Sequence, residues 1–376
     1  MKDLRLLQII PSLESGGAEQ ATVDVANYVD EQGLYSIIAS NGGRMLTQLN
    51  KYNLQHIDLP SYSKNPIVIF QNIKRIKKII LENNINIVHV RSRAPAWSVH
   101  YASKNLCRSI ATFHNVYGHE NILKRIYNKG LSKVDKVVAI SEYVKNSISK
   151  IYKIDENKIT VIHRGTDTDF FDIETKDEIK YLNFIRKFNL PDDKKIILFP
   201  GRLTKWKGQI EFLEILNSLN SNNIVCYFIG DDKNTNYKLN LQKEIYKKKL
   251  RVECKIFGHL SREDMRLMYK SADLIISAPL QPEGFGRVIS EGLAMKKIVL
   301  CYNFGGPKEQ LFGLDDLYAV EPYNKKQMLE KINIVFNLPI NKKNEIGAIA
   351  RKHIQNKFSK QIMMENYFKF YQDIIL

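Results

Sequence analysis

The feature that most constrains the fold is an alternation, along the whole chain, of short apolar runs with amphipathic helical patterns. Alternation of this kind produces parallel sheets with helices on both faces. Helical patterns between the runs include residues 18–29, 67–81 and 142–151. The expected strands are residues 4–10, 36–40, 55–59, 87–90, 109–113, 136–140 and 160–162, then 195–199, 225–229, 252–257, 274–277, 298–301 and 317–320.

The alternation breaks once, around residues 163–171, and a charged stretch follows it. A chain of 376 residues is also too long for one ordinary core. We therefore expect an α/β protein of two Rossmann-like, doubly wound parallel-sheet domains facing across a cleft. The first covers residues 1–170 and the second 171–357, and an aromatic-rich helix over 358–376 is expected to pack back on the first.

Composition narrows the class of protein. The chain is 44% hydrophobic and 26% charged, as in soluble globular proteins. Its four cysteines form no Cys-x-x-Cys pair, which favours neither a zinc site nor a disulfide framework and indicates a reducing compartment. The apolar stretch near the N-terminus is interrupted by Arg5 and Gln8 and is interpreted as a strand, not a secretion signal. We expect a cytoplasmic protein without a membrane span.

The net charge of +17 suggests a polyanionic partner: nucleic acid, an anionic membrane or a phosphorylated substrate. A nucleic-acid-binding protein is disfavoured because the sequence has no basic stripe with interleaved aromatics and no recognised module. The net charge alone does not distinguish between an anionic membrane and a phosphorylated substrate.

Ligands of open α/β sheets bind at the carboxyl ends of the strands, so residues that follow strands are the candidates. Gly16 and Gly17 lie between the first strand and its helix, where backbone can approach an anion. A tight turn that binds no ligand is an equally good interpretation of these two glycines. The dinucleotide fingerprint is absent, which disfavours hydride transfer.

His114 follows the strand at 109–113, where a histidine can donate to a substrate oxygen or carry a proton. A structural histidine is the more common case for a single such residue. Arg202 and Lys207 follow the strand at 195–199 and suit a diphosphate, which two fixed cations can neutralise without a metal. The alternative there is a solvated basic loop.

The most specific pattern follows the strand at 274–277. Glu283 precedes a helix expected to begin near Phe285, and Glu291 lies on its second turn. Carboxylates at this spacing can accept hydrogen bonds from sugar hydroxyls at two parts of one extended ligand. A capping acid and an exposed glutamate are the alternative. Gly284 and Gly286, which free backbone N–H groups beside Phe285, argue against it.

Taken together, these segments resemble glycosyltransferase family 4, the retaining enzymes of GT-B fold. The likeness covers nearly the whole chain, and its most specific element is Glu283-x7-Glu291. The segment at 89–98 further resembles a bacterial branch that serves capsule and lipopolysaccharide assembly. Supporting segments are residues 16–19, 201–208 and 164–171.

The resemblance implies a role for each position. Gly16 and Gly17 would approach the donor diphosphate, and Arg202 and Lys207 would clamp it. Glu291 would hold the ribose hydroxyls and Glu283 the transferred sugar. Phe285 and Gly286 would offer backbone donors, His114 would lie beside the anomeric centre, and the backbone of Gly258, His259 and Leu260 would bind the base.

The family transfers sugar from a nucleotide-diphosphate sugar with retention of configuration. It uses no essential metal and no further cofactor, so we expect neither here. Two departures concern local structure. Lys296-Lys297 replaces the usual Gly-x-Pro turn, and His163-Arg164 replaces Pro-Asn near the hinge between the domains.

The expected acceptor is a glycan or a lipid-linked molecule. Arg91, Arg93 and Trp97 follow the strand at 87–90 and are predicted to help recognise an acidic or phosphorylated acceptor, with a structural ion-pair cluster as the alternative. Peripheral contact with an anionic membrane is a further hypothesis. The basic helix at 67–81 is interpreted as an ordinary helix packed on the sheet.

Two rival functions share this fold. A sugar–nucleotide epimerase would act on the nucleotide sugar without an acceptor. A non-catalytic sugar-binding scaffold would be expected to lose Glu283, Arg202 or Lys207, and all three are present.

Overall fold

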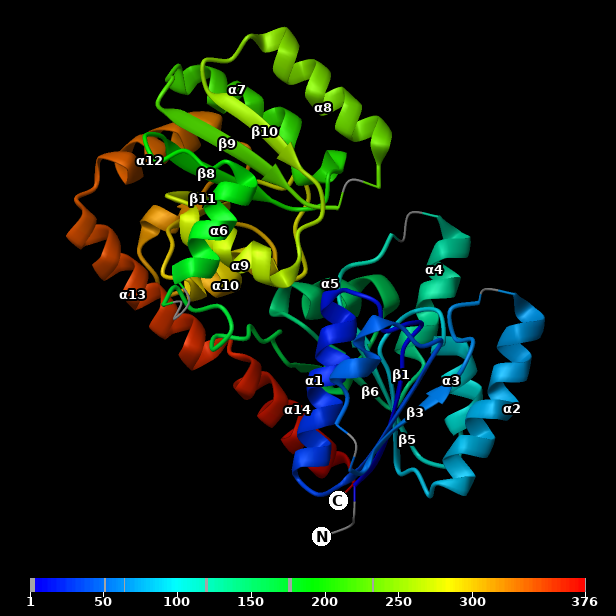
Figure 1. The fold of residues 1–376 in the computed structure, drawn as a ribbon. Coiled ribbons are helices and arrows are strands. Elements are labelled where there is room, and N and C mark those ends of the chain that lie inside the picture. The colour runs from blue at the N-terminus through cyan, green and yellow to red at the C-terminus, as the bar shows by residue number, and fades with distance from the viewer. Residues whose placement is uncertain are drawn as a thin grey trace. The chain divides into compact units, whose positions relative to one another are not determined.

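The computed structural model describes residues 4–50, 52–63, 65–118, 121–174, 178–231 and 233–375, and the chain divides into two compact units (Figure 1). Unit 1 comprises Met1–Gly165 together with Lys360–Leu376. Unit 2 comprises Thr166–Ser359. Each unit is built around one parallel sheet, as the strand–helix alternation predicted.

Unit 1 has a seven-stranded sheet in the order β3-β2-β1-β4-β5-β6-β7, and every pairing is parallel. Its strands are β1 (Arg5–Ile9), β2 (Tyr35–Ser40), β3 (Leu54–Asp58), β4 (Ile87–Val90), β5 (Arg108–Phe113), β6 (Lys136–Ala139) and β7 (Ile159–Val161). Its helices are α1 (Gly17–Glu31), α2 (Pro66–Glu82), α3 (Ala96–Ser103), α4 (Ile122–Lys129), α5 (Glu142–Tyr152) and α14 (Lys360–Ile375).

Unit 2 repeats this architecture with six parallel strands in the order β10-β9-β8-β11-β12-β13. Its strands are β8 (Lys195–Pro200), β9 (Ile224–Ile229), β10 (Glu253–Phe257), β11 (Leu274–Ser277), β12 (Val299–Tyr302) and β13 (Ala319–Val320). Its helices are α6 (Glu178–Phe188), α7 (Gln209–Leu219), α8 (Thr235–Lys248), α9 (Arg262–Ser271), α10 (Arg287–Ala294), α11 (Gly306–Leu311), α12 (Lys325–Asn337) and α13 (Ile340–Lys357).

The C-terminal helix belongs to unit 1, although the rest of unit 1 lies before residue 166. α14 contacts α1, and its apolar face joins the core formed by Leu4, Leu6 and Val25. The contributing residues of α14 are Met363, Met364, Tyr367, Phe370 and Tyr371. The expectation of one helix over 358–376 is wrong at its start, since α13 ends at Lys357 and α14 begins at Lys360.

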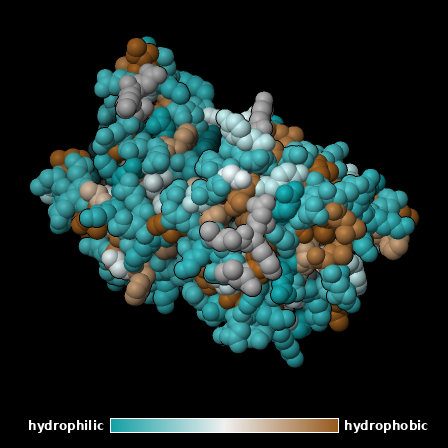
Figure 2. All heavy atoms as spheres, turned by 90° about the horizontal axis from the view of Figure 1, so that it is seen from below, coloured by the Kyte–Doolittle hydropathy of each residue, from teal (hydrophilic) through white to brown (hydrophobic). Residues whose placement is uncertain are grey.

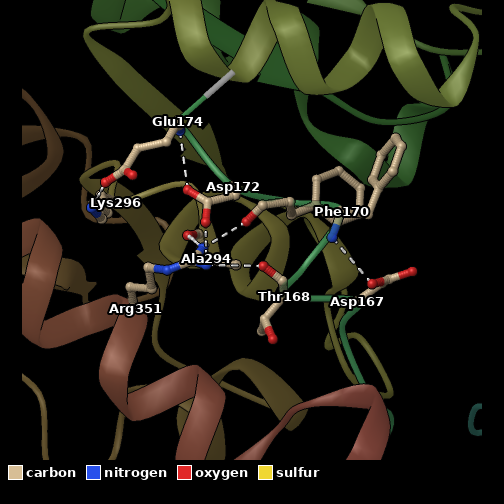
Figure 3. A network of polar contacts seen from close by, with 9 residues as sticks. Asp167, Thr168, Phe170, Asp172, Glu174, Ala294, Lys296 and Arg351 are labelled. Carbon is tan, nitrogen blue, oxygen red and sulfur yellow. Dashed lines mark hydrogen bonds and ion pairs between the residues drawn. The ribbon is translucent and has the colours of Figure 1, made fainter. Parts of the chain in front are cut away.

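The first segment of unit 2 is fixed by one buried arginine on α13 (Figure 3). Arg351 donates from Nη1 to the carbonyl oxygens of Phe171 and Ala294, over 2.8 and 2.6 Å. From Nη2 it donates to the Thr168 carbonyl over 3.0 Å and to the Asp172 carboxylate over 2.8 Å. A single side chain thus satisfies two backbone acceptors of a segment without regular structure and joins that segment to the C-terminal end of α10.

The division of the chain falls earlier than residue 170. Thr166 donates its backbone N–H to the Phe358 carbonyl over 2.8 Å, and Arg262 forms an ion pair with Asp167 at 2.8 Å. Residues 166–170 therefore belong with unit 2, because their hydrogen bonds lie there.

The surface of the face in Figure 2 is mainly hydrophilic, and apolar residues gather on it only in small groups. Within the described residues, no helix combines the length and the apolar character that crossing a membrane requires. The α2 helix packs against α3 and buries Ile76, Ile79 and Ile80.

Candidate active site

Two loops at the carboxyl end of the unit 2 sheet are tied to each other. The loop after β8 leads through a short 3-10 helix, η4 (Lys205–Lys207), and the other loop follows β11. Leu280 donates its backbone N–H to the Trp206 carbonyl over 2.6 Å. Gly208 has a φ of +82°, and an added Cβ would lie 2.3 Å from the Ala278 carbonyl oxygen. Glycine is thus required where the loops meet.

Lys207 and Glu283, predicted from separate motifs, form an ion pair across these two loops. The Lys207 Nζ lies 2.7 Å from the Glu283 Oε1, and only 12% and 13% of the two side chains are exposed. Charges this shielded interact more strongly than surface pairs. Arg202 is exposed, and its guanidinium carbon lies 6.0 Å from the centroid of the Trp206 ring. The Lys207 Nζ lies 4.5 Å from the same centroid. Two cations and one carboxylate therefore gather around Trp206.

Gly305 and Gly306, at the end of the neighbouring strand β12, hold the Glu283 loop in place. Gly306 donates its backbone N–H to the Glu283 carbonyl over 2.9 Å. An added Cβ on Gly306 would lie 2.3 Å from the Gly284 carbonyl oxygen. The sequence analysis did not identify this pair, although two adjacent glycines shortly after a buried strand are a usable signal.

The α10 helix begins at Arg287, two residues after Phe285, near which the sequence predicted its start. Gly286 is the N-cap residue with a φ of +92°, a conformation that favours glycine. Phe285 is buried, and its carbonyl accepts a hydrogen bond from the Gln310 side-chain amide. The helix start remains beside Glu283, where its first-turn amides are available to an anion.

Glu291 is held by side chains from two helices. Tyr269 of α9 donates its hydroxyl to the Glu291 Oε2 over 3.0 Å, and the Arg287 Nε lies 3.8 Å from Oε1. Burial first, and then the Glu291 carboxylate, raise the pKa of Tyr269 well above its ordinary value. Tyr269 is therefore a neutral donor that orients Glu291.

The segment Gly258, His259 and Leu260 follows β10 and precedes Ser261, which caps α9. His259 is exposed and its two neighbours are half-buried. The segment therefore lies at the same sheet edge and leads into the helix that carries the Tyr269 contact to Glu291.

In unit 1, Gly16 is the N-cap residue of α1 and Gly17 its first residue. An added Cβ on Gly16 would lie 2.3 Å from the Glu19 Oε2. The Glu19 carboxylate thus covers the helix start, a position where negative charge is favourable. An anion that binds these amides would have to displace it.

Both ring nitrogens of His114 have partners. Nε2 lies 3.0 Å from the Arg91 carbonyl oxygen and Nδ1 lies 3.0 Å from the Arg164 Nη2. Because Arg164 can only donate, Nδ1 accepts and the proton resides on Nε2. The pKa of His114 is lowered well below its ordinary value by burial, then by the charges of Arg164 and Arg91. The hydrogen bond to the Arg91 carbonyl has the opposite, smaller effect on this pKa. The ring is a neutral, oriented group.

Arg91 does not lie at the surface, as an acceptor-binding role would require. Its side chain is fully buried; Nε donates to the Gln8 Oε1 over 2.7 Å, and the guanidinium carbon lies 4.6 Å from the Tyr367 ring centroid. The Tyr371 hydroxyl lies 3.4 Å from Nη2. The expectation for Arg91 is therefore corrected to a structural role, in which it joins the sheet of unit 1 to α14.

The other two predicted acceptor residues differ from each other. Arg93 is exposed, and its guanidinium carbon lies 4.3 Å from the Tyr117 ring centroid. Trp97 is half-buried and donates its indole N–H to the Tyr127 carbonyl over 3.2 Å. Of the three, Arg93 is the one with a charged group available at the surface.

Stability of unit 1 is expected to fall as the pH is lowered below about 6.5. His89 is fully buried, with ring nitrogens 2.6 Å from the Tyr371 hydroxyl and 2.7 Å from the Thr112 hydroxyl. Burial first, then Arg91 and His114, lower the pKa of His89 well below its ordinary value. In acid the unfolded chain therefore binds protons that the folded chain does not. The free energy of unfolding then falls by about 1.4 kcal/mol per pH unit for each such histidine.

Urea titrations of the wild type and of His89→Gln between about pH 7.5 and 5.5 measure this dependence. The free energy of unfolding of the variant should have the shallower slope in acid, since one titrating group is gone. Equal slopes would contradict the role given to His89.

Comparison with known proteins identifies the family to which this architecture belongs. The family "Glycosyl transferases group 1" matches residues 181–353, and "Glycosyltransferase Family 4" matches residues 15–170. A glycosyltransferase from Rickettsia africae ESF-5, known from its crystal structure, is 38% identical, with a TM-score of 0.89 over 100% of this chain and 99% of that chain. Fold and site thus define a glycosyltransferase of GT-B type. The chain belongs to glycosyltransferase family 4.

Two further proteins are similar at lower identity. The capsular polysaccharide biosynthesis glycosyltransferase CapM of Staphylococcus aureus is 27% identical over 246 residues, 64% of this chain and 62% of that protein. Anabaena Alr3699/HepE, crystallised with UDP and glucose, is 15% identical with a TM-score of 0.82 over 98% of this chain and 100% of that chain. The second likeness is one of fold.

Proposed function

We propose that this protein transfers a sugar, with retention of configuration and without a metal, from a nucleotide-diphosphate sugar to a glycan or lipid-linked acceptor. The product would enter a cell-surface polysaccharide such as capsule or lipopolysaccharide. Similarity to CapM supports the biosynthetic setting, and the UDP and glucose bound by HepE support the class of donor. Unit 2 is proposed to bind the donor and unit 1 the acceptor.

The observation that carries the proposal is the shielded Lys207–Glu283 pair beside exposed Arg202 at the carboxyl end of the sheet. A donor diphosphate would compete for the Lys207 ammonium and release Glu283 to accept hydrogen bonds from the sugar. Lys207 and Arg202 would then stabilise the negative charge that develops on the leaving nucleotide diphosphate. Glu291, oriented by Tyr269, is proposed to accept the ribose hydroxyls.

In unit 1, Gly16 and Gly17 are proposed to approach the diphosphate of a bound donor. His114, neutral and fixed, is proposed to donate from Nε2 to a substrate oxygen once that N–H leaves the Arg91 carbonyl. Arg93 is proposed to meet an acidic or phosphorylated acceptor. We place the acceptor at an anionic membrane surface, which the net charge of +17 favours.

Calorimetric titration with UDP-, GDP- and ADP-sugars tests donor binding. One of them is expected to bind to the wild-type protein, and Glu291→Ala should weaken that binding by about ten- to a hundred-fold, because a buried carboxylate that pairs with ribose is lost. Glu309→Ala, which changes a glutamate of α11, is the matched control. No binding by any donor would contradict the proposal.

Chelation and product analysis test the reaction itself. Turnover should persist in EDTA, because Lys207 and Arg202 supply the charge that a metal would otherwise supply. NMR of the product should show the anomeric configuration of the donor. Inversion, or turnover of the nucleotide sugar to an epimer without an acceptor, would contradict the assignment.

A further inference from the structure

Unit 1 contains a basic cavity of about 370 Å³ that the proposed reaction does not use. It lies between the C-terminal half of α4 and the turn that joins α5 to β7. Five cationic side chains and a single acidic one line it: Arg125, Lys129, Lys133, Lys153, Lys158 and Asp155.

The charges of this cavity are not compensated by neighbours. Within the described part of the chain, none of its five cationic side chains forms an ion pair. The Asp155 carboxylate accepts the backbone N–H of Asn157 over 3.0 Å and so serves its own turn. A concave surface lined by like charges focuses a positive potential that attracts anions.

The α4 helix presents apolar side chains to solvent directly beside the cavity. Ile122, Leu123 and Ile126 are 72%, 73% and 53% exposed. Residues three or four apart share a helix face, which places Ile122 beside Arg125, and Ile126 beside Lys129. Three aliphatic residues exposed on two turns are costly in water unless something covers them.

We propose that α4 and this cavity form the surface on which the protein docks to a membrane containing anionic phospholipid. Ile122, Leu123 and Ile126 would enter the boundary between headgroups and acyl chains, and a lipid phosphate would occupy the cavity. An interfacial helix has this combination of an apolar face and flanking lysine or arginine. The inference rests on the proposed function only for the location of the acceptor.

The chemistry of the surface favours lipid over other anions. Nucleic-acid sites for single strands use aromatic rings for stacking, and the exposed face of α4 is aliphatic. A free phosphate would explain the cavity but not the apolar residues. The α2 helix also exposes apolar side chains, at Ile67 and Phe70, but it does not line this cavity, and its isoleucines at 76, 79 and 80 pack inside unit 1. It is therefore the weaker candidate.

Co-sedimentation of the full-length protein with vesicles tests the proposal. Binding to mixed phosphatidylcholine–phosphatidylglycerol vesicles should exceed binding to phosphatidylcholine alone by about ten-fold or more, and should weaken with salt. Arg125→Gln/Lys129→Gln and Ile122→Ser/Leu123→Ser/Ile126→Ser should each lower the partition coefficient by about ten-fold or more. The control Lys77→Gln/Lys78→Gln removes the same charge from α2 and should bind as the wild type.

Two results would overturn the proposal: equal partition onto both kinds of vesicle, or α4 variants that bind as well as the control. Thermal unfolding checks that the variants fold, as changes of exposed side chains should permit. Calorimetry with the nucleotide sugar on the same variants separates the two hypotheses. Donor binding should be unchanged in them even where vesicle binding is lost.

Discussion

Replacing Lys207 with methionine is expected to lower kcat/KM for the nucleotide sugar by about 10²–10³-fold, the usual effect of losing one charge-stabilising group in a shielded site. The ammonium is 2.7 Å from Glu283 and only 12% exposed, so water cannot replace it effectively. Methionine keeps most of the length of the side chain and its apolar stem, and it removes the ammonium. The loss should therefore reflect charge and not packing. Initial rates with the donor identified by calorimetry measure it.

Lys205→Met is the matched control, because Lys205 lies in the same short helix and is exposed. Its rate should stay within about two-fold of the wild type, as expected for a surface charge. Glu283→Gln should lower the rate while it leaves a hydrogen-bonding partner for Lys207. Rates for Lys207→Met that match those of Lys205→Met would remove the basis of the proposed chemistry.

Replacing Arg351 with methionine is expected to destabilise unit 2 by about 3–5 kcal/mol, because breaking a buried charged network leaves its partners uncompensated. Arg351 donates four hydrogen bonds, three of them to carbonyl oxygens of Thr168, Phe171 and Ala294. Those acceptors would be left without a donor in a buried position. Urea unfolding monitored by tryptophan fluorescence in a Trp97→Phe background, where Trp206 is the remaining tryptophan, reports on this unit.

Lys352→Met changes the next residue, which is exposed, and should alter the unfolding free energy by less than about 0.5 kcal/mol. Equal stability of the two variants would show that residues 166–172 are held by other contacts. A loss confined to donor affinity in Arg351→Met would point the same way.

The sheets were predictable because most strands, β3, β7 and β10 excepted, are short and nearly continuous buried runs. The segment at 274–277 coincides with β11, and those at 87–90 and 225–229 match β4 and β9 to within one residue. Parallel strands covered by helices on both faces have this apolar character. The helices between them are amphipathic, with one apolar face and one polar face. Helix ends were less predictable, since the start of α10, for example, is set by the positive φ of Gly286, a backbone conformation that periodicity does not report.

The candidate site was predictable where position along a strand decides it. Lys207 and Glu283 follow neighbouring strands β8 and β11, and the ends of neighbouring parallel strands meet. Arg91 shows the limit of this argument. It also follows a strand, but an inward neighbour, Gln8, and the rings of α14 capture its side chain. Those partners lie far away in sequence, so local pattern could not identify them.

The contribution of α14 to the core of unit 1 has a consequence for how the protein is made. Tyr367, Tyr371 and the other buried residues of α14 complete a hydrophobic core whose remaining members lie within the first 162 residues. Since the N-terminal part of a chain leaves the ribosome first, unit 1 must wait, incomplete, until α14 has been synthesised, whereas unit 2 has its last strand and helices earlier. A nascent chain stalled before residue 360 should therefore carry a protease-resistant second half and a protease-sensitive first half, the reverse of the order of synthesis.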